Sequence, residues 1–251
     1  MKKTLLTTLL CCGMQAIMSP LSAMPVIETN SSEAEAPDKS NNVIARIDLP
    51  AFSGVHCDVV AHIIIEQGNE YFIEAKGPEH IIQLIDPELK QAGGTLVIKA
   101  KKEYKIGKEG LLIRIVTPKL ELIYNEGVGD IRTKGAFKAQ MMTITSEGVG
   151  NITVENMECE RMQVINEGVG NVNLTGKATN AVFKSEGVGN INAYDLEVAS
   201  LSAELSGVGG IKCNVTERFT CKASGVGNIY YKGNPQQTNV SASGIGKVRK
   251  Q

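Results

Sequence analysis

The distribution of apolar and polar residues divides the chain into four segments. An apolar run follows Lys2 and Lys3 and reaches Met18, which is typical of a secretory signal cleaved after Ala23. A polar stretch comes next, and from Val43 onward short aliphatic runs alternate with turn residues. We therefore predict a signal peptide at 1–23, a disordered polar tether at 24–42, an N-terminal β region at 43–125 and a repeat region at 126–251.

The N-terminal β region contains short runs that are rich in β-branched residues and are bounded by turn residues. Only residues 79–90 could hold a helical turn, and Pro87 limits its length. The sequence leaves open whether this region continues the repeat architecture or forms a separate cap. The runs that predict strands are 59–65, 71–75, 95–100 and 111–116.

A hexapeptide built on Gly-Val-Gly-Asn-Ile recurs seven times in the repeat region. Successive copies start 21, 20, 19, 20, 18 and 19 residues apart. A period near 20 indicates a solenoid, in which each unit buries its apolar face by stacking on its neighbours. Leucine-rich repeats need a Leu/Asn framework that is missing, and two-helix repeats need longer units. We therefore predict an all-β fold, a parallel β-helix whose coils lie about 4.8 Å apart. The copies start at Glu126, Glu147, Glu167, Glu186, Ser206, Ser224 and Ser243.

The two glycines of each copy must serve the backbone, since each costs about 0.5–1 kcal/mol relative to alanine. Either the chain needs special dihedral angles there, or a neighbouring coil comes too close for a Cβ atom. The sequence does not decide which way the intervening valines Val128, Val149 and Val169 point. The last residue of each copy predicts a buried aliphatic ladder: Ile131, Ile152, Val172, Ile191, Ile211, Ile229 and Val248.

Two columns of polar residues are the candidate functional positions. If four repeated glutamates stack about 4.8 Å apart, neighbours repel by about 0.9 kcal/mol in water. The glutamate column is then a solvated face, a site for lysines or a cation such as calcium, or a contact with another chain. Repeated amides predict a structural hydrogen-bonded ladder. The first column is Glu126, Glu147, Glu167 and Glu186; the second is Asp130, Asn151, Asn171, Asn190 and Asn228.

Composition adds mainly exclusions. The net charge is −1, which argues against a nucleic-acid footprint. No nucleophile elbow or phosphate loop is present, so no catalytic residue is predicted. His56 and His62, six residues apart, are predicted to lie in one strand and hence on one face. The cysteines form no CxxC pair, so no metal site is predicted. Lipidation at Cys11 or Cys12 stays open, as does the disulfide pairing of Cys57, Cys159, Cys213 and Cys221.

The iterated motif, preceded by Asp48-Leu49-Pro50-Ala51-Phe52-Ser53-Gly54-Val55, resembles the "head GIN domain" family over about residues 44–249. Its members are exported proteins, mostly of Bacteroidetes, labelled "putative auto-transporter adhesins". The resemblance implies a right-handed parallel β-helix and an envelope or surface location, and it brings no catalytic residues. The chain ends three residues after the last motif, so we expect no membrane barrel within it.

These features favour an exported, non-catalytic, adhesin-like binding module whose partner is an envelope or host glycan or protein. The alternative is a structural, self-assembling and homo-oligomeric envelope protein, and a polysaccharide-active β-helix enzyme ranks below both. No cofactor is predicted apart from calcium as a candidate at the glutamate column. We expect no transmembrane segment in the mature chain, and a location in the periplasm, at the outer membrane or on the cell surface.

Overall fold

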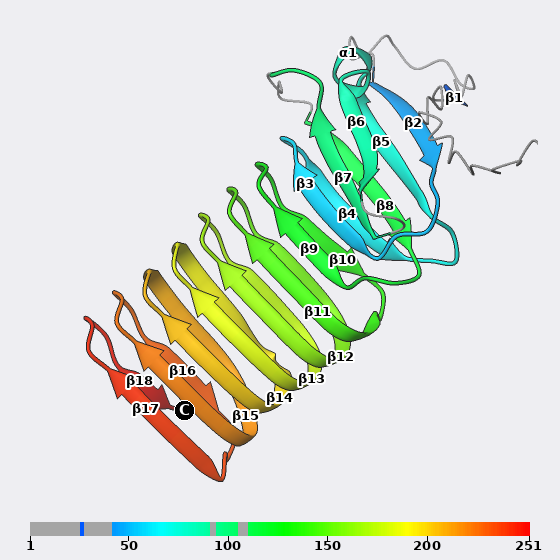
Figure 1. Ribbon diagram of the computed structural model, residues 1–251. Helices are drawn as coiled ribbons and strands as arrows, with labels where there is room; N and C mark the ends of the chain where they lie inside the picture. Colours follow the sequence, from blue (N-terminus) through cyan, green and yellow to red (C-terminus); the bar gives the residue numbers. More distant parts are fainter. Residues whose placement is uncertain (1–25, 28–41, 91–93, 105–109) are drawn as a thin grey trace, which may run out of the picture.

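The computed structural model describes residues 26–27, 42–90, 94–104 and 110–251. It shows an elongated β-solenoid with a smaller group of strands and one short helix at its N-terminal end (Figure 1). The predicted signal peptide, with Cys11 and Cys12, lies outside the described residues, and so does nearly all of the predicted tether.

The repeat region forms a stack of parallel strands. Each coil contains two extended segments that run along opposite sides of the solenoid, joined on one edge by the glycine motif (Figure 1). In the central coils a single long strand bends from one side to the other. The strands are β10 (Ile131–Lys134), β11 (Lys138–Ser146), β12 (Ile152–Asn166), β13 (Val172–Ser185), β14 (Val188–Leu205), β15 (Val208–Ala223), β16 (Ile229–Lys232), β17 (Gln237–Ala242) and β18 (Val248–Lys250).

The predicted aliphatic ladder is confirmed. Ile131 pairs in register with Ile152, Ile152 with Val172, and the series continues to Val248. From Ile131 to Ile229 each member is at most 1% exposed. Burying such a side chain gains roughly 1.5–3 kcal/mol, so the ladder offsets the entropic cost of the motif glycines.

The second strand of each coil completes the core by alternating large and small residues. Phe183 is fully buried and lies in register between Val164 and Ala203. Ala181, two residues earlier on the same inward face, lies between Met162 and Leu201. A large residue in one column thus coincides with a small one in the next, which keeps the interior close-packed.

The segment before the repeats both continues the stack and covers its end. Two of its strands stack directly on the first repeat coil, so the hydrogen-bonded solenoid begins at Gly54. The elements are β1 (Val26–Ile27), β2 (Asn42–Asp48), β3 (Gly54–Asp58), β4 (His62–Gln67), β5 (Phe72–Pro78), α1 (Glu79–Ile82), β6 (Ile85–Lys90), β7 (Thr95–Ala100), β8 (Leu112–Thr117) and β9 (Leu122–Asn125).

On the N-terminal side of β3 and β4, the stack changes from parallel to antiparallel pairing after one further strand on each side. On one side β8 pairs in parallel with β4, and then β5 and β2 follow as antiparallel strands. On the other side β7 pairs in parallel with β3, and β6 closes the sheet as an antiparallel strand. The outermost strands therefore no longer offer the parallel edge on which further coils stack.

The segment 79–90 holds a helical turn, as the sequence allowed, followed by a strand that the sequence did not predict. Its first turn forms α1, but residues 85–90 form β6 and not helix. Pro87 lies within β6 and pairs opposite Ile98 of β7. An edge strand tolerates proline because a missing N–H on the unpaired side costs no ladder bond.

Both explanations for the motif glycines hold together. A Cβ atom on Gly148 would lie 2.0 Å from the carbonyl oxygen of Gly127 in the previous coil. Gly150 has φ of 136°, and its Cβ would lie 2.2 Å from the Gly129 carbonyl oxygen. Only a residue without a side chain fits at either place, so successive corners can touch through their backbones.

Replacing one corner glycine should therefore destabilise the solenoid. In Gly170→Ala the new Cβ would lie 2.0 Å from the Gly150 carbonyl oxygen, at φ of 145°. We expect the free energy of unfolding to fall by more than about 1 kcal/mol, measured by urea denaturation. The control is Val169→Thr, an exposed change in the same coil that should shift the midpoint little. Equal midpoints for both variants would contradict this reading of the corner.

Candidate binding surface

The central valines of the motif point outward, which settles the orientation that the sequence left open. Six of them, from Val128 to Val226, are between 46% and 51% exposed. Each pairs as a parallel bridge with its counterpart in the next coil. Val60 extends the series by one coil, because it pairs in the same way with Val128. We call this series the valine row: Val60, Val128, Val149, Val169, Val188, Val208, Val226 and Ile245.

The four predicted glutamates also stack in register beside the valine row. The backbone N–H of Glu147 donates to the carbonyl of Asn125, and that of Glu167 to the carbonyl of Ser146. All four side chains are exposed. We call them the glutamate row: Glu126, Glu147, Glu167 and Glu186.

The glutamate row is poorly neutralised compared with acids elsewhere on the solenoid. At other coil junctions several acids face a lysine or arginine, as in Lys138–Glu158 at 2.7 Å and Lys222–Glu204 at 3.1 Å. Among the described residues, no lysine or arginine lies within 4.0 Å of a glutamate-row carboxylate. The row therefore keeps a negative strip along four coils.

One end of this row is organised by two aromatic neighbours. The Nε2 atom of His56 lies 2.5 Å from Glu126, and the Tyr124 hydroxyl lies 2.8 Å from Glu147 and 3.2 Å from Glu126. The ring centroids of His56 and Tyr124 lie 4.5 Å apart. The hydrogen bond to Glu147, together with partial burial and the Glu126 carboxylate, raises the pKa of Tyr124 well above its usual range. The tyrosine thus stays a neutral donor to the row.

The column of amides on the other side of the valine row forms a continuous ladder over four coils. Asn151 donates from Nδ2 to Asp130 at 3.1 Å, Asn171 to Asn151 at 3.1 Å, and Asn190 to Asn171 at 2.9 Å. Each accepting oxygen also receives the backbone N–H of the residue above. Asp130 suits the first position of the ladder because its carboxylate accepts hydrogen bonds from Asn151 and has no earlier ladder residue to which it must donate.

Asn228 lies at the same motif position but outside this ladder. Gly210 occupies the intervening coil and has no side chain with which to pass the hydrogen bond on. The Asn228 side chain instead accepts the backbone N–H of Lys247 at 2.9 Å. The structure thus joins four of the five residues that the sequence grouped.

Removing one side chain of the ladder should lower the free energy of unfolding, because hydrogen-bond donors of the next coil then lose their acceptor. Asn171→Ala leaves the backbone N–H and the Nδ2 of Asn190 without their acceptor, for an expected loss of about 1–3 kcal/mol in urea denaturation. Asp130→Asn is the control, because the retained oxygen still accepts both bonds. The ladder would have no structural role if Asn171→Ala unfolded at the same urea concentration as Asp130→Asn.

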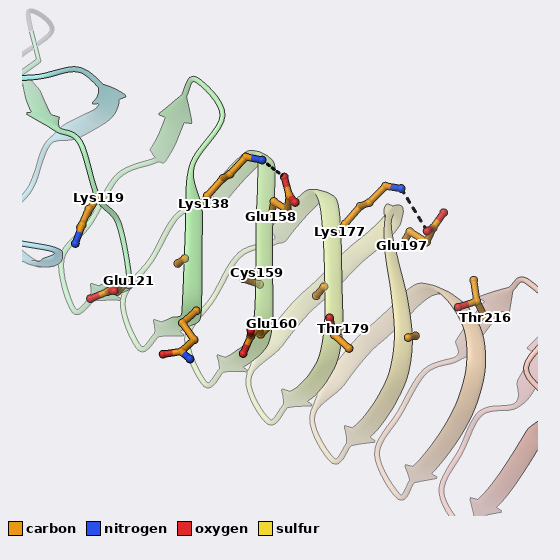
Figure 2. A pocket seen from close by; sticks show the side chains of 14 residues that line it. Lys119, Glu121, Lys138, Glu158, Cys159, Glu160, Lys177, Thr179, Glu197 and Thr216 are labelled. Atoms are coloured by element: carbon orange, nitrogen blue, oxygen red, sulfur yellow. Dashed lines mark ion pairs between the residues drawn. The ribbon is translucent and has the colours of Figure 1, made fainter.

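A second surface is a polar groove of about 710 Å³ near the opposite edge of the coils. Small side chains of Ala139, Cys159 and Ala178 form its floor. One wall carries the ion pairs Lys138–Glu158 and Lys177–Glu197, at 2.7 Å and 3.6 Å (Figure 2). These four charges are paired within the wall, whereas Glu121 and Glu160, which also line the groove, form no ion pair with any described residue.

The four cysteines of the described residues are buried free thiols, and none forms a disulfide. Burial raises the pKa of Cys159 and Cys221 to about 11 and that of Cys213 to about 12. Burial also raises the pKa of Cys57 far above its ordinary value. At neutral pH these groups are protonated and therefore poor nucleophiles or metal ligands.

The two neighbouring histidines do not share a strand, contrary to the sequence-based interpretation. His56 lies on β3 and His62 on β4, and only His56 reaches the glutamate row. Within the ranges that the structure describes, no group of three His, Cys, Asp or Glu residues is arranged to hold a metal ion. In the same ranges no helix is long and apolar enough to cross a membrane.

The fold and these surfaces define the class of protein: a capped β-solenoid that exposes repeated rows of side chains. The chain matches the family described as "Putative auto-transporter adhesin, head GIN domain" over residues 51–235, and it belongs to that family. The resemblance noted in the sequence is thereby confirmed. A search of curated proteins found no match.

Solved structures agree with this assignment. A "putative adhesin" from Bacteroides fragilis is 31% identical, with a TM-score of 0.81, over 84% of this chain and 97% of that chain. A "putative adhesin" from Parabacteroides merdae is 19% identical, with a TM-score of 0.63, over 84% and 98%. A "putative lipid binding protein" from Parabacteroides distasonis is 21% identical, with a TM-score of 0.62, over 83% and 97%. The last two show the fold alone.

Proposed function

We propose that this chain is an exported, non-catalytic, adhesin-like module that binds a glycan or protein of the cell envelope or of a host. Membership of an adhesin-type family supports a binding role at the cell surface. The observation that carries the proposal is the pair of exposed rows, valine and glutamate, which run side by side along one edge of the stack.

Repetition makes such an edge suitable for recognition. The valine row crosses seven coil intervals of about 4.8 Å, or roughly 34 Å in total. Its backbone is fixed by hydrogen bonds from coil to coil, so the side chains are held in position before a partner arrives. A preorganised surface loses little conformational entropy on binding, which favours affinity.

Two further ligand classes belong in the test. The relative from Parabacteroides distasonis is described as lipid binding, and its 21% identity carries the fold but not the ligand to this chain. Calcium is a candidate bridge between the stacked carboxylates, because it prefers oxygen ligands. Lipid vesicles and a chelator therefore accompany the glycans and proteins.

The test is binding of the full chain to an array of glycans, matrix proteins and lipid vesicles, with calcium or with chelator. One variant changes the glutamate row to glutamine, as Glu126→Gln, Glu147→Gln, Glu167→Gln and Glu186→Gln. The matched control removes four acids of the groove, as Glu121→Gln, Glu158→Gln, Glu160→Gln and Glu197→Gln. We expect saturable binding that the first variant loses and the control retains.

Other outcomes are equally specific. Loss in the control alone would keep the binding module and move its site to the groove. The absence of saturable binding to any array member would contradict the proposed function. Shortening of a polysaccharide during incubation would contradict the non-catalytic part of it.

A further inference from the structure

We infer that the valine row and the glutamate row together form a docking strip for a basic amphipathic α-helix of a partner protein. The inference rests on the proposed function, because it names the partner class of a binding module. Four features support it: uncovered aliphatic side chains, carboxylates without a lysine or arginine partner among the described residues, the distance between the rows, and their spacing along the solenoid.

The valine row is the main uncovered apolar feature of the described surface. Thirteen large apolar residues are exposed there, and eight of them belong to the row. From Val128 to Ile245 the glycines on both sides have no side chains that could cover the row. Threonine would satisfy the β-strand preference at these positions equally well, so the stack itself does not require aliphatic side chains. A contiguous aliphatic strip of this kind marks an interaction surface.

The glutamate row decides the charge of the partner. Lysine or arginine pairs with acids at other coil junctions, as at Arg132–Glu155 and Lys177–Glu197. Glu147, Glu167 and Glu186 have no such partner among the described residues. Their mutual repulsion is relieved if cations of a bound molecule lie along them. Lys184, two residues before Glu186, is the nearest cation in sequence, and no ion pair joins the two.

The distance between the rows fits the width of one helix. In each coil the glutamate precedes the valine by two residues, so their Cα atoms lie at most about 7 Å apart. An α-helix with its side chains is about 10–12 Å wide. A helix lying along the solenoid can therefore contact both rows at once.

The spacing along the rows favours a helix over an extended strand. Successive coils lie about 4.8 Å apart, and a helix presents one side per turn every 5.4 Å or so. Over the three intervals of the glutamate row, the helix drifts by only about 1.8 Å. Same-face residues of a strand recur about every 6.6 Å and drift by about 5.4 Å, more than one whole coil.

These constraints define the expected partner sequence. Apolar residues recur at helical spacing, i, i+3, i+4 and i+7, to lie on the valines. Lysine or arginine follows one flank of that apolar stripe, where it faces the carboxylates. A helix with acidic residues on that flank is excluded by charge.

The test uses three synthetic peptides of 18 residues and the full chain. The first carries leucines on one face and lysines along the flank; the second has glutamate in place of each lysine; the third is a scrambled form of the first. Binding is measured by fluorescence anisotropy at low salt and at about 0.15 M salt, because the contribution of surface charges falls with ionic strength. We expect binding of the first peptide only, weaker at the higher salt.

Two triple variants test whether the peptide binds at the valine row and the glutamate row. Val149→Thr, Val169→Thr and Val188→Thr keep the β-branched shape and remove the aliphatic contact, whereas Glu147→Gln, Glu167→Gln and Glu186→Gln remove the charge. Each should weaken binding of the first peptide at least about tenfold. The control Glu158→Gln, Glu160→Gln and Glu197→Gln removes equal charge from the groove and should leave binding within about twofold.

Several results would overturn the inference. Equal binding of all three peptides, or losses in the groove control as large as in the strip variants, would show that the contact is nonspecific. Binding to vesicles, or a dimer in sedimentation, that the valine variant abolishes would assign the valine row to a lipid surface or to a second copy. If array binding persists but no peptide binds, the helix inference fails while the proposed function stands.

Discussion

The structure depends on one constraint: at the glycine corner, the backbones of successive coils come into direct contact. The N–H of Val149 donates to the Gly127 carbonyl at 3.0 Å, and the N–H of Gly150 donates to the Val169 carbonyl at 2.9 Å. No Cβ atom fits between them. Because the corner holds each coil at hydrogen-bonding distance from the next, the flanking residues fall into register.

Each position of the motif has its own structural role, and this explains why so short a motif determines so much of the molecule. The glycines serve the coil-to-coil contact, and the following isoleucine or valine fills the core. The asparagine continues a ladder that binds one coil to the next. The valine and the glutamate have no such inward role, since both point to solvent. Surface chemistry can therefore be varied without disturbing the stack.

The sequence predicted those parts of the fold that repeat. The period near 20 gave the solenoid, and the ladder from Ile131 to Val248 followed from motif position. The cap could not be derived, because nothing in the chain before Glu126 reveals which strands pair antiparallel. Within the segment 79–90, where the sequence allowed a helical turn, residues 85–90 form an edge strand through pairing with β7, which the sequence did not reveal.

Among the candidate-site residues, too, those that belong to the repeat could be predicted and most of the others could not. Both polar columns could be read from motif position alone. His56 could not, since it reaches Glu126 from a strand 70 residues earlier in the chain. Tyr124 lies only two residues before Glu126, but its hydrogen bond to Glu147 of the next coil depends on the stacking of the coils. Val60 joins the valine row without any flanking glycine in its own coil. The groove carried a readable signal, because Lys138, Glu158, Lys177 and Glu197 also recur near the 20-residue period.

Amide hydrogen exchange at the corners tests the central claim most directly. Corner segments of most proteins exchange quickly because their amides face solvent. Here the amides of Val149, Gly150, Val169 and Gly170 are bonded from coil to coil. We predict that they exchange as slowly as the amide of Ile152 in the neighbouring strand. Rapid exchange at these four amides, beside a protected Ile152, would contradict the account, because the corners would then be ordinary loops.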